Sequence, residues 1–289
     1  MVDLTMTQPL PSFVHRFSAM GTRIELHLFG DGAKAALANA LQAVIDAVDD
    51  ALTIHRPSPT TQLNERLRGG GVAVIDEPIL RNALQASIAG HRKTGGLFDP
   101  AFGPHAAGLA HVSLGDAGEQ IVADRAIAFD FGGVGKGFAL DCCRPVLAGA
   151  GVESAILSLG DSSILLWGGH PLGGDWPIAI PDPCGAEGSL AELALRDCCL
   201  SVSSSQGAGQ TATLRPDTGI AVSEPRTAIV AHPSGARAEI FSTALLAAHS
   251  DERACLVAAI KGEGGMAIIV DHAVPANSAL QRDLAEAIP

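Results

Sequence analysis

The sequence contains no long apolar run and no basic stripe, and each absence excludes a class of protein. No stretch approaches the roughly 18 consecutive apolar residues that indicate a membrane-spanning helix. The N-terminal segment holds Pro9 and Pro11 and no apolar core of signal-peptide length, so we expect neither secretion nor membrane insertion. Of 289 residues, 19 are basic and 31 acidic, and the net charge of −12 repels nucleic-acid phosphates. These absences predict a cytoplasmic protein that binds no nucleic acid.

Metal-binding cysteine motifs and the serine-hydrolase motif are also missing. Four of the six cysteines form the adjacent pairs Cys142-Cys143 and Cys198-Cys199, and no C-x-x-C spacing indicates zinc. Because cytosolic thiols stay reduced, we expect these cysteines to be small buried apolar side chains. The serine run Ser203–Ser205 lacks the Gly-x-Ser-x-Gly pattern of a hydrolase nucleophile.

The residues that are present are typical of a globular chain. Apolar residues make up 47% and charged residues 17%, which excludes a disordered chain. Alternation of Ile24, Leu26 and Leu28 predicts a strand over residues 22–29, and helical spacing predicts a helix over residues 37–52. A loop with Pro57 and Pro59 is expected to follow. Further strands are expected at 126–131, 155–159, 164–167, 176–180, 227–231 and 266–270, and further helices from 78, from 136, at 239–248 and at 252–261.

The irregular alternation of these elements predicts an α+β fold in which helices cover mixed β-sheets. No break in composition marks a linker. We therefore expect one domain over residues 12–285, preceded by a short disordered segment at residues 1–11.

A glycine-rich turn follows a predicted strand and begins a predicted helix. It reads Asp130-Phe131-Gly132-Gly133-Val134-Gly135-Lys136-Gly137. Backbone N–H groups in that context bind anions, and Lys136 adds positive charge. A Walker A loop would need Gly at Asp130 and Ser or Thr at Gly137, and the third Rossmann glycine falls on Phe138. The turn is either a plain strand-to-helix connection or a site, and the Asp130 carboxylate favours a site because it can accept hydrogen bonds from a heterocycle or ribose.

A second pattern lies near the start of a later predicted helix. Glu239 and Thr243 are four residues apart and therefore share one helix face. A carboxylate and a hydroxyl suit a hard cation such as Mg²⁺, which would polarise a bound pyrophosphate. The alternative is an ordinary solvated helix face.

Five segments in fixed order are typical of one family. They are Met20-Gly21-Thr22, Ser58 with Leu63-Asn64, Gly95-Gly96-Leu97-Phe98-Asp99-Pro100 with Gly103-Pro104, Asp130 to Asp141, and Glu239 to Thr243. From about Phe17 to about Val270 the chain resembles the ApbE family, the FAD:protein FMN transferases. The resemblance implies an ApbE-like α+β fold.

The resemblance also implies a reaction and a set of site residues. The enzyme would cleave the FAD pyrophosphate with Mg²⁺, transfer FMN onto a Ser or Thr hydroxyl of a partner flavoprotein and release AMP. Such phosphoryl transfer depends on positioning and charge neutralisation. The implied FAD-site residues are Met20, Leu97, Phe98, Asp99, Asp130, Lys136 and Leu214. The implied metal-site residues are the Gly133 carbonyl, Glu239, Ser242 and Thr243, and no catalytic residue is assigned.

The sequence departs from the family pattern at several positions. Glu239 stands where Asp is usual, and Ile54 replaces a Tyr. In the segment that resembles His-x-x-Asp-Pro-x-Thr-Gly, Ala212 replaces His and Arg215 replaces Asp. If those two groups deprotonate the incoming hydroxyl, their loss would slow transfer by roughly 10²–10⁴-fold. Arg215 either pairs with a phosphate or belongs only to a turn around Pro216.

Three functions therefore remain open at the level of sequence. The first is Mg²⁺-dependent FMN transfer to a partner protein. The second is FAD binding by a member of the fold that has lost the chemistry. The third is an FAD pyrophosphatase that releases FMN and AMP to water. All three predict FAD binding.

Overall fold

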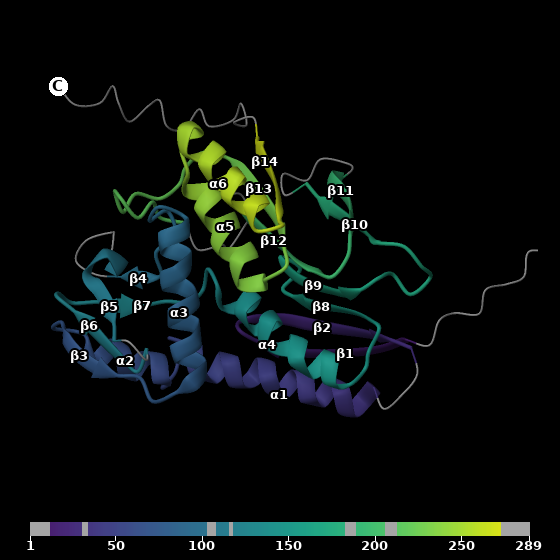
Figure 1. Cartoon of the computed structure of the whole chain (residues 1–289), viewed down its shortest axis with the longest axis horizontal. Coiled ribbons are helices and arrows are strands. Elements are labelled where there is room, and N and C mark those ends of the chain that lie inside the picture. The colour runs from purple at the N-terminus through teal and green to yellow at the C-terminus, as the bar shows by residue number, and fades with distance from the viewer. Residues whose placement is uncertain are drawn as a thin grey trace, which may run out of the picture.

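The largest element of the fold is a seven-stranded antiparallel sheet with strand order β1-β2-β8-β9-β12-β13-β14 (Figure 1). The computed structural model describes residues 12–30, 34–102, 108–115, 118–182, 189–205 and 213–272. The strands of this sheet are β1 (Ser12–Ala19), β2 (Thr22–Phe29), β8 (Ser154–Leu159), β9 (Ser163–Gly168), β12 (Cys198–Ser204), β13 (Arg226–His232) and β14 (Met266–Asp271). The expected disordered segment at residues 1–11 lies outside the described residues, and the domain limits of 12 and 285 stay a prediction.

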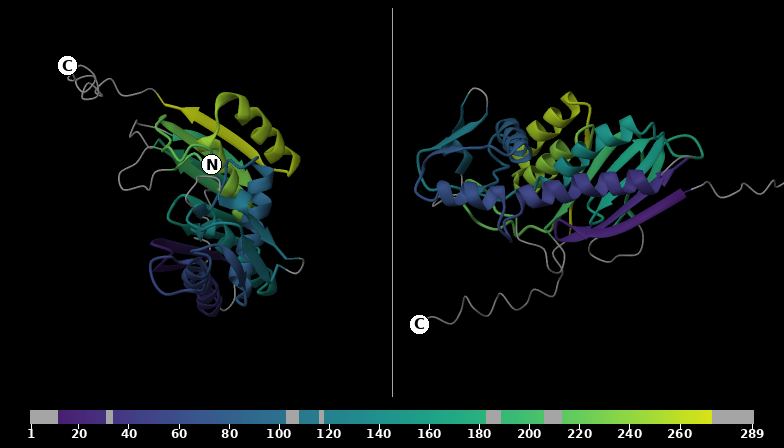
Figure 2. Two further views of the ribbon diagram at one scale, coloured as in Figure 1. Left: turned by 90° about the vertical axis from the view of Figure 1, so that its left-hand side faces the viewer. Right: turned by 90° about the horizontal axis from the view of Figure 1, so that it is seen from below.

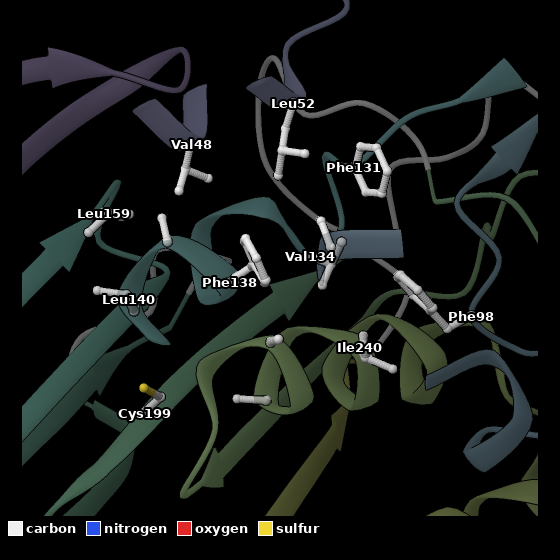
Figure 3. Packing of buried hydrophobic residues seen from close by; sticks show 14 of the residues in the cluster. Val48, Leu52, Phe98, Phe131, Val134, Phe138, Leu140, Leu159, Cys199 and Ile240 are labelled. Carbon is white, nitrogen blue, oxygen red and sulfur yellow. The ribbon is translucent and has the colours of Figure 1, made fainter. Parts of the chain in front are cut away.

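Helices cover one face of the large sheet. They are α1 (Lys34–Leu52), α4 (Gly135–Gly149), α5 (Gly235–Ala247) and α6 (Ser250–Gly262). The view from below in Figure 2 shows α1 running along the molecule above β1 and β2. Figure 3 shows Val134, at the start of α4, and Phe138 of α4 between Val48 and Leu52 of α1 on one side and Ile240 of α5 on the other. This layer holds the larger of the two hydrophobic cores.

A two-stranded ribbon packs on the opposite face of the sheet. It consists of β10 (Trp176–Pro181) and β11 (Ser189–Leu195), paired antiparallel. Trp176 and Ile180 join Leu166, Leu200 and Ile229 of the large sheet in a second, smaller core. Because the middle of the sheet is covered on both faces, its strands carry apolar residues on both sides.

The remaining elements gather beside α3 (Pro78–Lys93), at the left of Figure 1. They are α2 (Pro59–Arg66), the three-stranded sheet β3 (Gly71–Val74), β6 (Gln120–Ala123) and β5 (Val112–Leu114), the pair β4 (Ala101–Phe102) and β7 (Ala128–Phe129), and the short helix η1 (Gly108–His111). This arrangement confirms the α+β fold with helix-covered sheets, although the paired strands of the described residues are antiparallel and the sheets are not mixed as expected. In the described part of the chain, no helix combines the length and hydrophobicity needed to cross a bilayer.

The loop expected around Pro57 and Pro59 is partly wrong, and helix capping explains why. The residues after Pro57 were expected to form a loop, but α2 begins at Pro59. The Ser58 hydroxyl accepts a hydrogen bond from the Thr61 N–H at 3.0 Å, and the Thr61 hydroxyl accepts one from the Ser58 N–H at 2.8 Å. This capping box satisfies two backbone donors, and proline is well tolerated at the first helical position. Proline here begins a helix instead of preventing one.

Strand boundaries differ mainly where the sequence is polar or a turn is tight. The strand expected at 126–131 shortens to Ala128–Phe129, because Phe131 already belongs to the glycine-rich turn. In the large sheet, β1 and β12 were not expected, and outside it the same holds for β3, β4, β5, β6 and β11. In β12, Ser201, Ser203 and their neighbours hide the alternating pattern, although the strand lies in the middle of the sheet.

The cysteine expectation holds for two of the paired residues. Cys143 and Cys199 are fully buried, whereas Cys142 and Cys198 are half-buried. Burial raises the pKa of the Cys199 thiol to about 12, so it stays protonated and unreactive near neutral pH. Cys143 and Cys199 belong to the larger core between α4 and β12, whereas Cys198 packs against the smaller core on the other face of the sheet.

Candidate functional site

Helices α4 and α5 cross at their first turns with their backbones in contact. A Cβ on Gly137 would overlap the carbonyl group of Gly235 and lie 2.9 Å from the Ala236 nitrogen. A Cβ on Gly235 would in turn overlap the Gly137 carbonyl oxygen. Glycine at both positions permits this approach because it has no side chain. The crossing places the glycine-rich turn directly against the helix that carries Glu239 and Thr243.

Asp141 fastens the start of α5 to α4. Its Oδ1 accepts a hydrogen bond from the Gly235 N–H at 2.7 Å, and its Oδ2 accepts one from the Ala236 N–H at 3.0 Å and one from the Ser234 hydroxyl at 2.7 Å. A helix leaves its first N–H groups without internal partners, and a carboxylate there also interacts favourably with the helix dipole. Asp141 therefore fixes where α5 begins and, one turn later, where Glu239 lies.

Replacing Asp141 by alanine is expected to lower the free energy of unfolding by about 1–2 kcal/mol, the usual effect of losing a helix cap. Urea unfolding followed by circular dichroism measures the change. Asp50→Ala is the matched control, because the Asp50 side chain is 73% exposed and its ion pair with Arg56 lies on the surface of α1. Equal stability of the two variants would contradict the anchoring role of Asp141.

Glu239 is buried and receives hydrogen bonds on both carboxylate oxygens. Oε2 accepts from the Gly137 N–H at 2.8 Å, and Oε1 accepts from the Ser163 hydroxyl at 2.6 Å. The Lys136 ammonium lies 3.2 Å from Oε1, with side-chain exposure of 24% for Lys136 and 5% for Glu239. Burying a carboxylate without such partners would cost several kcal/mol, on the order of the penalty for an unpaired buried charge. The glycine-rich turn thus supplies both a backbone donor and a cation to Glu239.

A small cavity of about 60 Å³ opens between the turn and α5. Its lining residues are Gly133, Lys136, Ser162, Ser163, Ser201, Val202, Ser203, Glu239 and Thr243. Thr243 closes one side, since a Cβ on Gly133 would lie 3.6 Å from the Thr243 Oγ1. Ser242 is buried and does not line the cavity. Its hydroxyl forms hydrogen bonds with the hydroxyls of Ser201 at 2.9 Å and Ser203 at 2.8 Å, and it donates to the Glu239 carbonyl at 3.0 Å.

The donor chemistry of this cavity suits Mg²⁺. Hydroxyls of Thr243 and the serines, the nearby Gly133 backbone and the Glu239 carboxylate are hard oxygen donors, and Mg²⁺ is commonly held by one or two carboxylates with substrate phosphates and water. Within the described ranges, no three His, Cys, Asp or Glu side chains cluster. That result argues against a site built from several charged ligands, but not against a site with one carboxylate and a phosphate.

Two residues implied in FAD binding lie beside the glycine-rich turn. A Cβ on Gly133 would lie 3.5 Å from the Phe98 ring, and one on Gly135 would lie 3.3 Å from the Met20 methyl group. Met20 adopts a φ of 52°, an uncommon conformation for a non-glycine residue. Phe98 is buried at 3% exposure. Both side chains therefore support the turn at close range.

The two implied aspartates bond to nearby backbone. Asp130 Oδ1 accepts from the Gly132 N–H at 2.8 Å and shapes the turn. The Asp99 side chain is 1% exposed, and its oxygens accept from the N–H groups of Ala101 at 2.9 Å and Leu109 at 3.0 Å. Burial raises the pKa of the Asp99 carboxyl, although those two N–H groups oppose the shift. Asp99 thus holds the β4 segment in place.

The two implied leucines lie away from the small cavity. Leu97 lines a separate, more open hollow of about 520 Å³ between the end of α3 and the start of α6. Leu214 is 43% exposed and pairs with Ala221 in a short hairpin. The structure therefore brings together Met20, Phe98, Gly133, Lys136, Glu239, Ser242 and Thr243, and does not place Leu97 or Leu214 in the cavity lining.

Arg215 has internal partners. Its guanidinium donates to both Asp217 oxygens at 3.1 Å, lies 3.6 Å from a Glu252 oxygen and donates to the Ala247 carbonyl at the end of α5. The side chain is only 12% exposed. These contacts favour the structural interpretation over pairing with a phosphate: Arg215 fastens the turn around Pro216 to the end of α5.

Sequence reasoning missed Ser163 and the structural role of Asp141. Asp141 had a signal, because it lies four residues after Gly137 and therefore on the same face of α4. No sequence pattern indicated Ser163, because it hydrogen-bonds to Glu239, which lies 76 positions further along the chain.

Comparison with known proteins gives one family and one fold. The model described as the ApbE family matches residues 20–269. The apo flavinyl transferase ApbE of Pseudomonas stutzeri is 20% identical, with a TM-score of 0.77 over 92% of this chain and 94% of that chain. The ApbE protein of Thermotoga maritima is 18% identical, with a TM-score of 0.75 over 90% of this chain and 94% of that chain. The flavin transferase ApbE of Vibrio cholerae is 16% identical, with a TM-score of 0.76 over 92% of this chain and 95% of that chain. No curated protein matches the sequence.

Proposed function

The chain belongs to the ApbE family, and from this membership and the geometry of the cavity we propose that it transfers the FMN part of FAD to a partner flavoprotein. The acceptor is a Ser or Thr hydroxyl, the released product is AMP, and the reaction requires Mg²⁺. The observation that carries this proposal is the meeting of the Gly133 turn with Glu239 and Thr243 in one oxygen-lined cavity. A metal ion held there would lie beside the phosphates of a bound dinucleotide.

The reaction is a displacement at phosphorus. The acceptor oxygen forms a bond to the phosphorus of the FMN part, the bridging P–O bond to the AMP part breaks, and AMP leaves with the electron pair of that bond. Bound Mg²⁺ would neutralise charge on the pyrophosphate. Glu239, Thr243 and the Gly133 carbonyl would hold it, while Lys136 offers a positive charge to a phosphate and Phe98 supports the turn. The protein contributes mainly positioning and electrostatics.

The acceptor hydroxyl must lose its proton to a base. A transferase needs such a base, whereas a protein that only binds FAD does not. Ala212, which replaces the family's His, lies outside the described residues. Arg215, which replaces the Asp, is bound to Asp217 and Glu252 and cannot accept a proton. This observation favours one second candidate, an FAD-binding protein of the same fold without transferase chemistry.

Incubating the purified protein with FAD, Mg²⁺ and an acceptor protein bearing a Ser or Thr target tests the proposal. We expect flavin fluorescence on the acceptor band in a denaturing gel, with one AMP released per transfer. An acceptor with its target residue changed to alanine is the control. FAD that binds and stays intact would support the non-catalytic candidate, whereas free FMN and AMP without labelling would indicate a pyrophosphatase. Absence of FAD binding would contradict all three.

A further inference from the structure

Lys136 and Glu239 form an ion pair inside the cavity proposed for the metal. The Lys136 Nζ lies 3.2 Å from Glu239 Oε1. The same oxygen accepts from the Ser163 hydroxyl at 2.6 Å, and Oε2 accepts from the Gly137 N–H at 2.8 Å. The carboxylate therefore already has two hydrogen-bond donors and an ion-pair partner, and the side chain of that partner, Lys136, also lines the cavity.

A divalent ion bound to Glu239 would lie close to the Lys136 ammonium. Mg²⁺ binds oxygen at about 2.1 Å, while the ammonium is at ion-pair distance from the same oxygen. The cavity is only about 60 Å³, so the two cations would lie within a few ångströms of each other, where repulsion is strong because little water screens them.

We propose that Lys136 is a built-in counter-ion of Glu239 that a divalent cation must displace. The ammonium stabilises the buried carboxylate when no metal is bound, and it opposes metal binding by the same interaction. Its 24% exposure gives it a path toward the mouth of the cavity. This inference rests on the proposed function only for the choice of Glu239 as a metal ligand.

The test is Mn²⁺ affinity of the full-length protein, measured by titration calorimetry and electron paramagnetic resonance at pH 8. Lys136→Met removes the charge and leaves an unbranched side chain one atom shorter. We expect it to bind Mn²⁺ about tenfold more tightly than the unmodified protein, because no ion pair has to be broken. Lys136→Arg keeps the charge and should not bind Mn²⁺ more tightly than the unmodified protein. Lys93→Met is the matched control, since Lys93 pairs with Glu263 at 3.0 Å outside this cavity.

Thermal unfolding provides the second readout and a check on folding. Lys136→Met should melt at a lower temperature than the unmodified protein without metal, and Mn²⁺ should raise its melting temperature by a larger amount. Lys136→Gln serves if the methionine variant does not fold. A folded variant that binds Mn²⁺ equally or more weakly would overturn the inference. Transfer of FMN in the preceding assay is scored separately, so the proposed function can stand when the counter-ion role fails, and the reverse.

Discussion

Replacing Gly137 by alanine is expected to destabilise the protein by about 3 kcal/mol or more, at the upper end of the range for overpacking. The added Cβ would overlap the backbone carbonyl of Gly235, which cannot rotate away as a side chain would. Helix α5 would have to move away from α4, and the hydrogen bond from the Gly137 N–H to Glu239 would lengthen. Urea unfolding monitored by circular dichroism measures the loss.

Gly149→Ala is the matched control on the same helix. Gly149 is exposed at the end of α4, and a Cβ there meets nothing within 4 Å. Alanine should leave stability unchanged or raise it by up to about 1 kcal/mol, because it has the higher helix propensity. If both glycine variants behaved alike, the backbone contact between α4 and α5 would not be what Gly137 provides.

Replacing Glu239 is expected to have the largest effect on activity. Glu239→Gln removes the charge of the cavity's carboxylate while keeping its shape, so FMN transfer should fall by about 10²–10³-fold, the range seen when one preorganised electrostatic group is removed. Glu239→Asp restores the residue of the family pattern and should retain most of the activity. The measurement is the initial rate of acceptor labelling at saturating FAD and Mg²⁺.

Stability has to be followed alongside these rates. Glu239→Ala would leave Lys136, Ser163 and the Gly137 N–H without their partner, and breaking a buried ion pair costs about 3–5 kcal/mol. The glutamine variant is therefore the one to assay, after its melting curve shows that it is folded. Glu192→Gln, at an exposed position of β11, is the control. Full activity of Glu239→Gln would contradict an electrostatic role for this carboxylate.

Much of the site could be predicted from local pattern, because local pattern decides local backbone. The order of glycines in residues 130–137 predicts a turn before a helix, and α4 begins at Gly135. The spacing of Glu239 and Thr243 predicts a shared face, and both line the cavity. The resemblance to the ApbE family, carried by five short segments, is confirmed by the family model and by the fold. The roles of single residues in binding FAD or metal stay predictions.

The sequence by itself determined the family, the α+β class and the two segments that line the small cavity. It did so because turns, helix faces and capping depend on residues within about four positions of one another. Only the tertiary structure decided what each side chain meets. Gly137 contacts Glu239 across 102 positions, and Asp141 contacts Gly235 across 94. Such pairs depend on how closely two helices cross, and that closeness follows from packing of the whole layer around α4 and α5.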